Sequence, residues 1–178
     1  PGRANAGARV GPVVVSEIMY DPGTLPDGTV GEEFVELYNA SGIPVPLFDP
    51  LHPAATWRLE GAATLAFPTD LWLPPHGFLV LVGFHPAQDL NRVAAFRAQY
   101  HVKGEGTLLG PWQGHLNNAG ETIRLVRPGV PSAAQQSAGT TPYLLVEQVS
   151  YAPTAPWPTK AAGTGYSLAR RFLSLYAD

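Results

Sequence analysis

The chain contains no cysteine among its 178 residues, which excludes disulfide bonds and thiolate metal sites. Charged residues are also scarce, at 14%, and the formal net charge is -3. Because hydrophobic residues make up 45% of the chain, we expect it to fold rather than stay disordered. The basic residues are scattered, with only Arg170 and Arg171 adjacent. A nucleic-acid surface needs clustered Lys and Arg, so we do not expect a nucleic-acid partner.

Long apolar runs are absent as well. The longest, FLVLVGF over residues 78–84, is far too short to cross a bilayer, so we expect no membrane span. The chain begins at Pro1 without a charged and apolar leader, which suggests a piece of a longer precursor whose targeting signal lies elsewhere. Residues 1–11 are small and polar and are predicted to form a flexible linker, followed by one domain over 12–178.

Familiar catalytic motifs are missing. The sequence has no G-x-S-x-G, H-E-x-x-H or G-x-x-x-x-G-K-[ST] pattern. Five histidines, at positions 52, 76, 85, 101 and 115, are isolated from one another. We interpret them as ordinary loop imidazoles and predict that the chain is not an enzyme, although a triad assembled only in space stays open.

Turn-forming residues are abundant, with 19 glycines and 19 prolines. Between them lie short segments rich in β-branched and aromatic residues, several of which alternate apolar and polar positions. The predicted strands cover residues 13–20, 33–39, 57–60, 64–67, 78–82, 122–127, 144–151 and 166–170. A single short helix is predicted within a loop at 89–100, with Asp89 as its N-cap, and 128–142 is predicted to be a long loop. These elements indicate an all-β sandwich of two mostly antiparallel sheets.

Acidic residues concentrate in the first two predicted strands and the loop between them. They are Glu17, Asp21, Asp27, Glu32, Glu33 and Glu36. Calcium takes several carboxylate and carbonyl ligands with tolerant geometry, so Glu17, Asp21 and Glu33 form a candidate calcium site, although no EF-hand pattern supports it. The alternative is a structural role, in which Glu17 or Glu36 pairs with Arg58 or Arg170 across the sheet.

The four tryptophans, at positions 57, 72, 112 and 157, allow two interpretations. They could form a platform that stacks on carbohydrate, or they could be core and corner residues. Trp57 alternates with Leu59, which favours a structural place in the core. Trp157 lies between prolines in APWPTKAAGTG, and we expect it to pin that segment onto the sandwich. For Trp72 and Trp112 both interpretations stay open.

The order of the segments adds a further indication. The chain runs through VVVSEIMYDP, EFVELYNAS, WRLEGA, TLAFPTDLWLPPHGFLVLV, FRAQYHV, HLNNAGETIRLVRP and VEQVSYAPTAPWPTKAAGTGYSLAR. This succession, over residues 12 to 171, resembles the bacterial lamin-tail domain family, and its PWPTKAAGTGYSL ending is the most distinctive part. The stretch FDPLHPAAT at 48–56 is an insertion relative to the family pattern and is a candidate for a specific contact.

The resemblance implies an immunoglobulin-like β-sandwich without enzymatic activity of its own. It further implies a non-catalytic interaction or spacer module of a larger secreted or cell-surface bacterial protein. The expected partners are other domains of the same precursor or surface proteins, and the expected location is extracellular. The alternative function is a calcium-stabilised adhesin, or an accessory of a metal-dependent hydrolase, that uses the acidic group near residues 17–36. No cofactor other than this possible calcium ion is expected.

Overall fold

The computed structural model describes residues 11–26, 28–102 and 107–173. Strands make up 39% and helices 11%, which confirms the prediction of an all-β, sandwich-like fold. Only the last residue of the predicted linker at 1–11 lies within the described residues, and residues 174–178 lie outside them.

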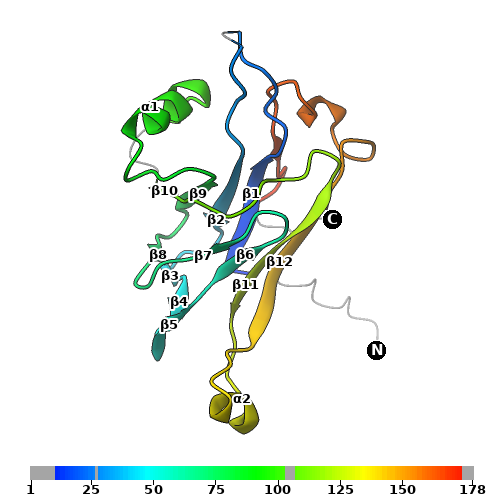
Figure 1. Ribbon diagram of the computed structural model, residues 1–178. Coiled ribbons are helices and arrows are strands. Elements are labelled where there is room, and N and C mark those ends of the chain that lie inside the picture. The colour runs from blue at the N-terminus through cyan, green and yellow to red at the C-terminus, as the bar shows by residue number, and fades with distance from the viewer. Residues whose placement is uncertain (1–10, 27, 103–106, 174–178) are drawn as a thin grey trace.

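Two sheets form the body of the molecule (Figure 1). The first has the strand order β10-β9-β2-β1-β13, and the second has the order β12-β11-β6-β7. The strands of the first sheet are β1 (Val13–Met19), β2 (Phe34–Asn39), β9 (Phe78–Val82), β10 (Thr107–Leu109) and β13 (Leu168–Ala169). Those of the second are β6 (Arg58–Glu60), β7 (Leu65–Ala66), β11 (Glu121–Pro128) and β12 (Tyr143–Tyr151).

Two small strand pairs flank the sheets. They are β3 (Val45–Pro46) with β8 (Trp72–Leu73), and β4 (Phe48–Asp49) with β5 (His52–Thr56). The predicted insertion at 48–56 is this second pair, a hairpin whose tip residue, Leu51, is 85% exposed. All strand pairs of the named strands are antiparallel except β9 with β10, which run parallel. Helix α1 (Leu90–Gln99) connects these two strands.

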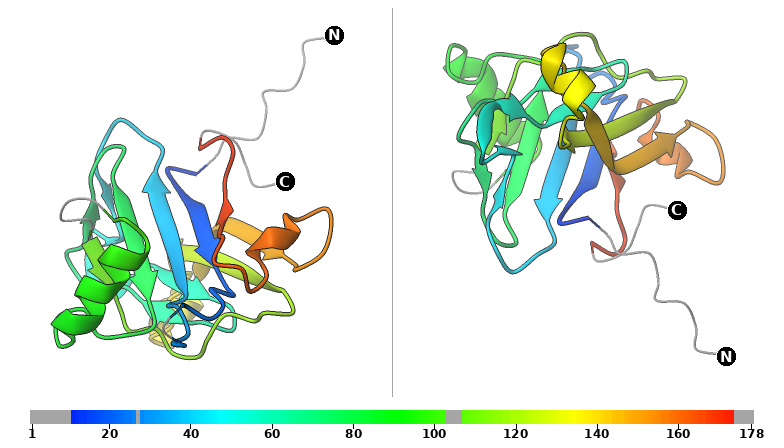
Figure 2. Two further views of the ribbon diagram at one scale, coloured as in Figure 1. Left: turned by 90° about the horizontal axis from the view of Figure 1, so that it is seen from above. Right: turned by 90° about the horizontal axis from the view of Figure 1, so that it is seen from below.

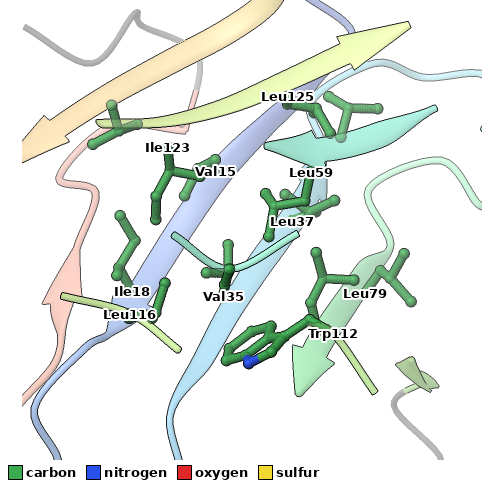
Figure 3. Packing of buried hydrophobic residues seen from close by; sticks show 14 of the residues in the cluster. Val15, Ile18, Val35, Leu37, Leu59, Leu79, Trp112, Leu116, Ile123 and Leu125 are labelled. Atoms are coloured by element: carbon green, nitrogen blue, oxygen red, sulfur yellow. The ribbon is translucent and has the colours of Figure 1, made fainter. Parts of the chain in front are cut away.

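The main core lies between the two sheets (Figure 3). Strand β1 contributes Val13 and Val15 to this core before a bulge at Ser16, and Ile18 after it. The bulge changes which alternate positions face inward, because one extra residue shifts a strand of period two by one place. Without it, Glu17 would take the inward position that Ile18 occupies.

Helix α1 covers the opposite face of the first sheet (Figure 2). On this face a second cluster joins Phe96 to Met19, Phe34 and Val82. The helix begins where predicted, and the Asp89 side chain caps it by accepting the N–H of Arg92 at 3.0 Å. Within the helix, Phe96 is buried, whereas Leu90 is 72% exposed. Phe96 reaches the cluster together with Val93 and Tyr100, which are partly buried.

Other predictions differ more. The predicted long loop at 128–142 contains a short helix, α2 (Ala133–Ser137), and a 3-10 turn, η1 (Thr159–Ala161), precedes the last strand. Trp57 is 4% exposed in the main core, which confirms its predicted place, and Trp157 packs against the same core as expected. Over the residues described, no helix has the length and apolar character needed to cross a membrane.

Candidate functional site

A surface pocket of about 310 Å³ lies where three central strands end on the same side of the first sheet. Its lining comes from the loop after β1, the approach to β2, the loop after β9, helix α1 and the segment between β10 and β11. The lining residues are Asp21, Pro22, Val30, Gly31, Glu32, Glu33, Gly83, Arg92, Trp112, Gly114 and Asn118. We call this feature the strand-end pocket. Antiparallel pairing of β1 with β2 and of β2 with β9 brings these loops to one end.

Glu32 and Arg92 neutralise each other at this pocket. The Arg92 guanidinium donates to both carboxylate oxygens of Glu32 in a two-pronged contact, with both donor–acceptor distances at 2.8 Å. The same guanidinium lies 4.8 Å from the centre of the Phe84 ring, and Tyr100 donates its hydroxyl to the Glu32 carbonyl at 2.6 Å. Such bidentate pairs fix geometry as well as charge. Arg92 is therefore committed to Glu32, which ties α1 to the approach to β2.

Glu33 contributes a carboxylate that is only partly used. One oxygen accepts the backbone N–H of Leu116 at 2.9 Å, which holds the side chain in place. Burial raises the pKa of Glu33 above its ordinary value, while the hydrogen bond from Leu116 and the nearby His115 act in the opposite direction. The carboxylate is thus oriented by the backbone and keeps a second oxygen for another donor.

Asp21 lies directly after β1, and its backbone forms an isolated bridge with Ala162 and accepts the N–H of Gly163 at 3.0 Å. These contacts hold the residue through its main chain. Its side-chain carboxylate makes no hydrogen bond to another residue of the described ranges, and the residue is only partly exposed. Asp21 lines the pocket, and its carboxylate lies beside Gly163, where a Cβ would be 3.3 Å from Oδ2, so the carboxylate oxygens keep hydrogen-bonding capacity for a further donor.

Trp112 contributes a hydrogen-bond donor to the pocket, whereas Asp21 and Glu33 contribute acceptors. The residue is 5% exposed and belongs to the main core, yet it also lines the strand-end pocket. Within residues 11–26, 28–102 and 107–173, its indole N–H has no hydrogen-bond acceptor. Figure 3 shows the ring nitrogen on the edge turned away from Val35 and Leu37. Buried polar groups normally find partners, so this N–H points to a ligand or solvent in the pocket.

Gly83 keeps that donor accessible. A Cβ added at Gly83 would lie 3.0 Å from the indole nitrogen of Trp112, closer than side chains normally pack. Gly83 itself lines the same pocket. The absence of a side chain at position 83 therefore leaves the indole edge open.

The candidate calcium ligands are only partly brought together. Asp21 and Glu33 line the strand-end pocket, whereas Glu17 does not, and its carboxylate instead accepts the hydroxyl of Ser167. Across the described ranges, no group of three or more His, Asp or Glu side chains is placed to hold a metal ion. Asp27, another member of the acidic group, lies outside the described residues.

The structure does not pair Glu17 or Glu36 with Arg58 or Arg170, as the sequence had predicted. Glu36 accepts the Ser16 hydroxyl at 2.7 Å, and burial raises the pKa of its carboxyl group. Arg58 instead stacks over the ring of Tyr143, 4.1 Å from its centre. The bulge at Ser16 places its hydroxyl beside Glu36, whereas the Glu17 carboxylate accepts the hydroxyl of Ser167.

Arg170 does form a buried ion pair, with Glu147 of β12 as its partner. The side chains are 7% and 3% exposed. Arg170 also donates from Nε to the carbonyl of Val15 at 2.9 Å, and the Glu147 carboxylate accepts the N–H of the same residue. The structural role predicted for Arg170 is therefore correct, but it joins the two sheets rather than two strands of one sheet.

The histidines with side-chain partners lie at the surface. His52 contacts the Asp49 carboxylate at 2.9 Å in the β4–β5 hairpin, and His76 contacts the Tyr38 hydroxyl at 3.1 Å. Neither lines the strand-end pocket. Trp72, the other tryptophan with an open role, is 49% exposed on β8 and packs edge-on against Phe48.

Sequence reasoning found the acidic part of the pocket and missed its other half. Asp21, Glu32 and Glu33 stood out as part of a local acidic concentration, whereas Trp112, Gly83 and Asn118 come from segments distant in sequence. For Trp112 the sequence left the choice between a core residue and a carbohydrate-stacking platform open.

Compared with models of protein families and with curated protein sequences, the chain gives no match to either.

Proposed function

We propose that the chain is a non-catalytic interaction module of a larger secreted or cell-surface bacterial protein. In this role it contacts other domains of its precursor or neighbouring surface proteins. The resemblance of its segments to the lamin-tail domain family supports this function, and so does the low and scattered charge of the chain. Fold alone does not define a ligand, so the argument depends on the site.

The observation that carries the proposal is the strand-end pocket. It combines a backbone-held carboxylate on Glu33 with two groups that have no hydrogen-bond partner among the described residues, the carboxylate of Asp21 and the indole N–H of Trp112. These residues lie outside the named strands, and backbone contacts hold them: Asp21 bridges to Ala162, Glu33 accepts the N–H of Leu116, and the backbone N–H of Trp112 donates to the carbonyl of Val82 at 3.1 Å. A pocket with unused donors and acceptors is suited to bind polar groups of a partner.

A retention experiment tests this function. The immobilised domain is incubated separately with its flanking precursor domains, with solubilised envelope proteins and with purified cell-wall glycan, and bound material is quantified. We expect specific retention of a protein, and we expect this retention to disappear when the fraction is first digested with protease. Turnover of ester, phosphoester or glycoside substrates by the domain would contradict a non-catalytic role, and retention of glycan alone would contradict protein contact.

A further inference from the structure

The charge of the strand-end pocket selects for a cation. Among the described residues of its lining, Arg92 is the only basic one, and it is already paired with Glu32 through two hydrogen bonds. Asp21 and Glu33 remain as carboxylates without a cationic partner in the lining. Because charge-assisted hydrogen bonds are about twice as strong as neutral ones, an ammonium group is the donor that these two acceptors favour.

A cation alone cannot form a hydrogen bond with the indole N–H of Trp112. As a donor, it is satisfied only by an acceptor, and an ammonium group has none. The residue is 95% buried, but its indole N–H is not among the buried atoms without a partner in the described residues, so solvent in the pocket reaches it. An occupant that displaces this solvent must supply an oxygen in its place to keep the hydrogen bond. The occupant must therefore carry an ammonium group and, close to it, a hydrogen-bond acceptor.

We propose that the strand-end pocket binds the free amino terminus of a partner polypeptide. The carboxylates of Asp21 and Glu33 hold the terminal ammonium, and the first carbonyl oxygen accepts the N–H of Trp112. This inference rests on the proposed function, to which it adds the class of partner. Capture of chain termini by fixed polar groups is a recurrent mode of peptide recognition.

Two competing occupants fit less well. A lysine side chain brings an ammonium at the end of four methylene groups, without an acceptor beside it. A neutral sugar brings acceptors but leaves the carboxylates without a cationic partner. The pocket volume of about 310 Å³ lies at the lower end of the usual range for ligand sites, roughly 300 to 1,000 Å³, so it suits a terminal residue rather than a long segment.

Isothermal titration calorimetry with small probes tests the inference. The probes are dialanine amide, which has both groups, N-acetyl dialanine amide, which lacks the ammonium, butylamine, which lacks the acceptor, and methyl glucoside, a neutral sugar. We expect dialanine amide to bind, and we expect each other probe to bind about tenfold or more weakly. Equal binding of the acetylated peptide, or binding of methyl glucoside alone, would overturn the proposal.

Variants locate the binding. Asp21→Asn and Glu33→Gln should each weaken dialanine amide about tenfold or more by removing a charge, while Gln at position 33 can still accept the Leu116 N–H. Gly83→Ala should weaken it as well, because the added Cβ would lie 3.0 Å from the indole nitrogen. Asp70→Asn, at an exposed position outside the pocket, is the matched control and should change nothing. Unchanged affinity in Asp21→Asn and Glu33→Gln would contradict the assignment.

The two proposals can fail separately. If the immobilised domain retains a protein but dialanine amide does not bind, the function stands and the terminus site is wrong. If dialanine amide binds with the expected variant pattern but no protein is retained, the pocket assignment stands and the interaction function is wrong.

Discussion

The ion pair of Glu147 with Arg170 closes one edge of the sandwich. Strand β13 ends at Ala169, and the backbone N–H of Arg170 still bonds the carbonyl of Ser16 at 2.8 Å. At the preceding residue of β1, Val15, side chains replace the backbone as partners. Arg170 donates to the carbonyl of Val15, and the Glu147 carboxylate accepts its N–H. Side chains thus satisfy backbone groups at a sheet edge that would otherwise be unpaired.

Glu147→Gln tests this role by removing the charge with little change in shape. The amide oxygen can still accept the Val15 N–H, but the guanidinium of Arg170, 7% exposed, then lacks its buried counter-charge. Breaking a buried pair from one side costs roughly 3 to 5 kcal/mol. Because the Val15 carbonyl still accepts from Arg170, we expect the lower end, about 3 kcal/mol. For a chain of this size that corresponds to a fall in melting temperature of roughly 6 to 12 °C.

Urea denaturation and thermal melting of purified variants measure the effect. Arg171→Met is the matched control for Arg170→Met, since Arg171 is adjacent in sequence but exposed. The double variant Glu147→Gln with Arg170→Met should cost less than the sum of the two single changes, because both remove the same interaction. A loss below about 1 kcal/mol in Glu147→Gln, similar to that in Arg171→Met, would refute the reasoning.

Three further predictions concern single groups. Tyr20→Phe should raise stability by about 1 kcal/mol in urea denaturation, because the Tyr20 hydroxyl is fully buried without a partner in the described residues, and a decrease would show that the hydroxyl is bonded. Glu36→Gln should stabilise the fold at pH 7. Because burial raises the pKa of Glu36 in the folded chain, its favourable contribution to the free energy of unfolding is present below the unfolded pKa of about 4.3 and is lost as the pH rises through the folded pKa. The difference in stability between Glu36→Gln and the unchanged chain should therefore disappear near pH 4. Calcium and EDTA should give identical melting temperatures, because Glu17 lies apart from Asp21 and Glu33, whereas a rise with calcium would restore the calcium hypothesis.

Strand pattern could be predicted where a segment was long enough to show alternation. β9 matches its predicted bounds, and β1, β2, β11 and β12 match within one residue, because each carries several β-branched or aromatic residues between turn signals. The missed strands are β3, β4 and β8, with two residues each, β10 with three and β5 with five, and β5 (HPAAT) carries a proline and no apolar alternation. Two residues show no period, so only tertiary contacts define such strands. The parallel pair β9–β10 was also not predicted, because its partner strand follows a helix rather than a turn.

The site was predictable only where its residues are close in sequence. A bulge such as that at Ser16 has no clear sequence pattern, yet it decides that Glu36 meets a hydroxyl instead of an arginine. Arg170 was expected to be structural, but its partner Glu147 lies on the other sheet, so register within one sheet could not reveal it. Trp112 joins the pocket through the folding of a long irregular segment after β10, which alternation does not describe.

The indole N–H resonances of the four tryptophans give the most direct test of the account. In ¹⁵N-correlated NMR spectra recorded during titration with dialanine amide, the Trp112 resonance, assigned with Trp112→Phe, should move in a saturable way. The resonances of Trp57 in the core and Trp72 on β8 should stay in place. A titration in which Trp72 moves and Trp112 does not, or in which N-acetyl dialanine amide moves Trp112 equally, would contradict the claim that this chain recognises a partner through the strand-end pocket.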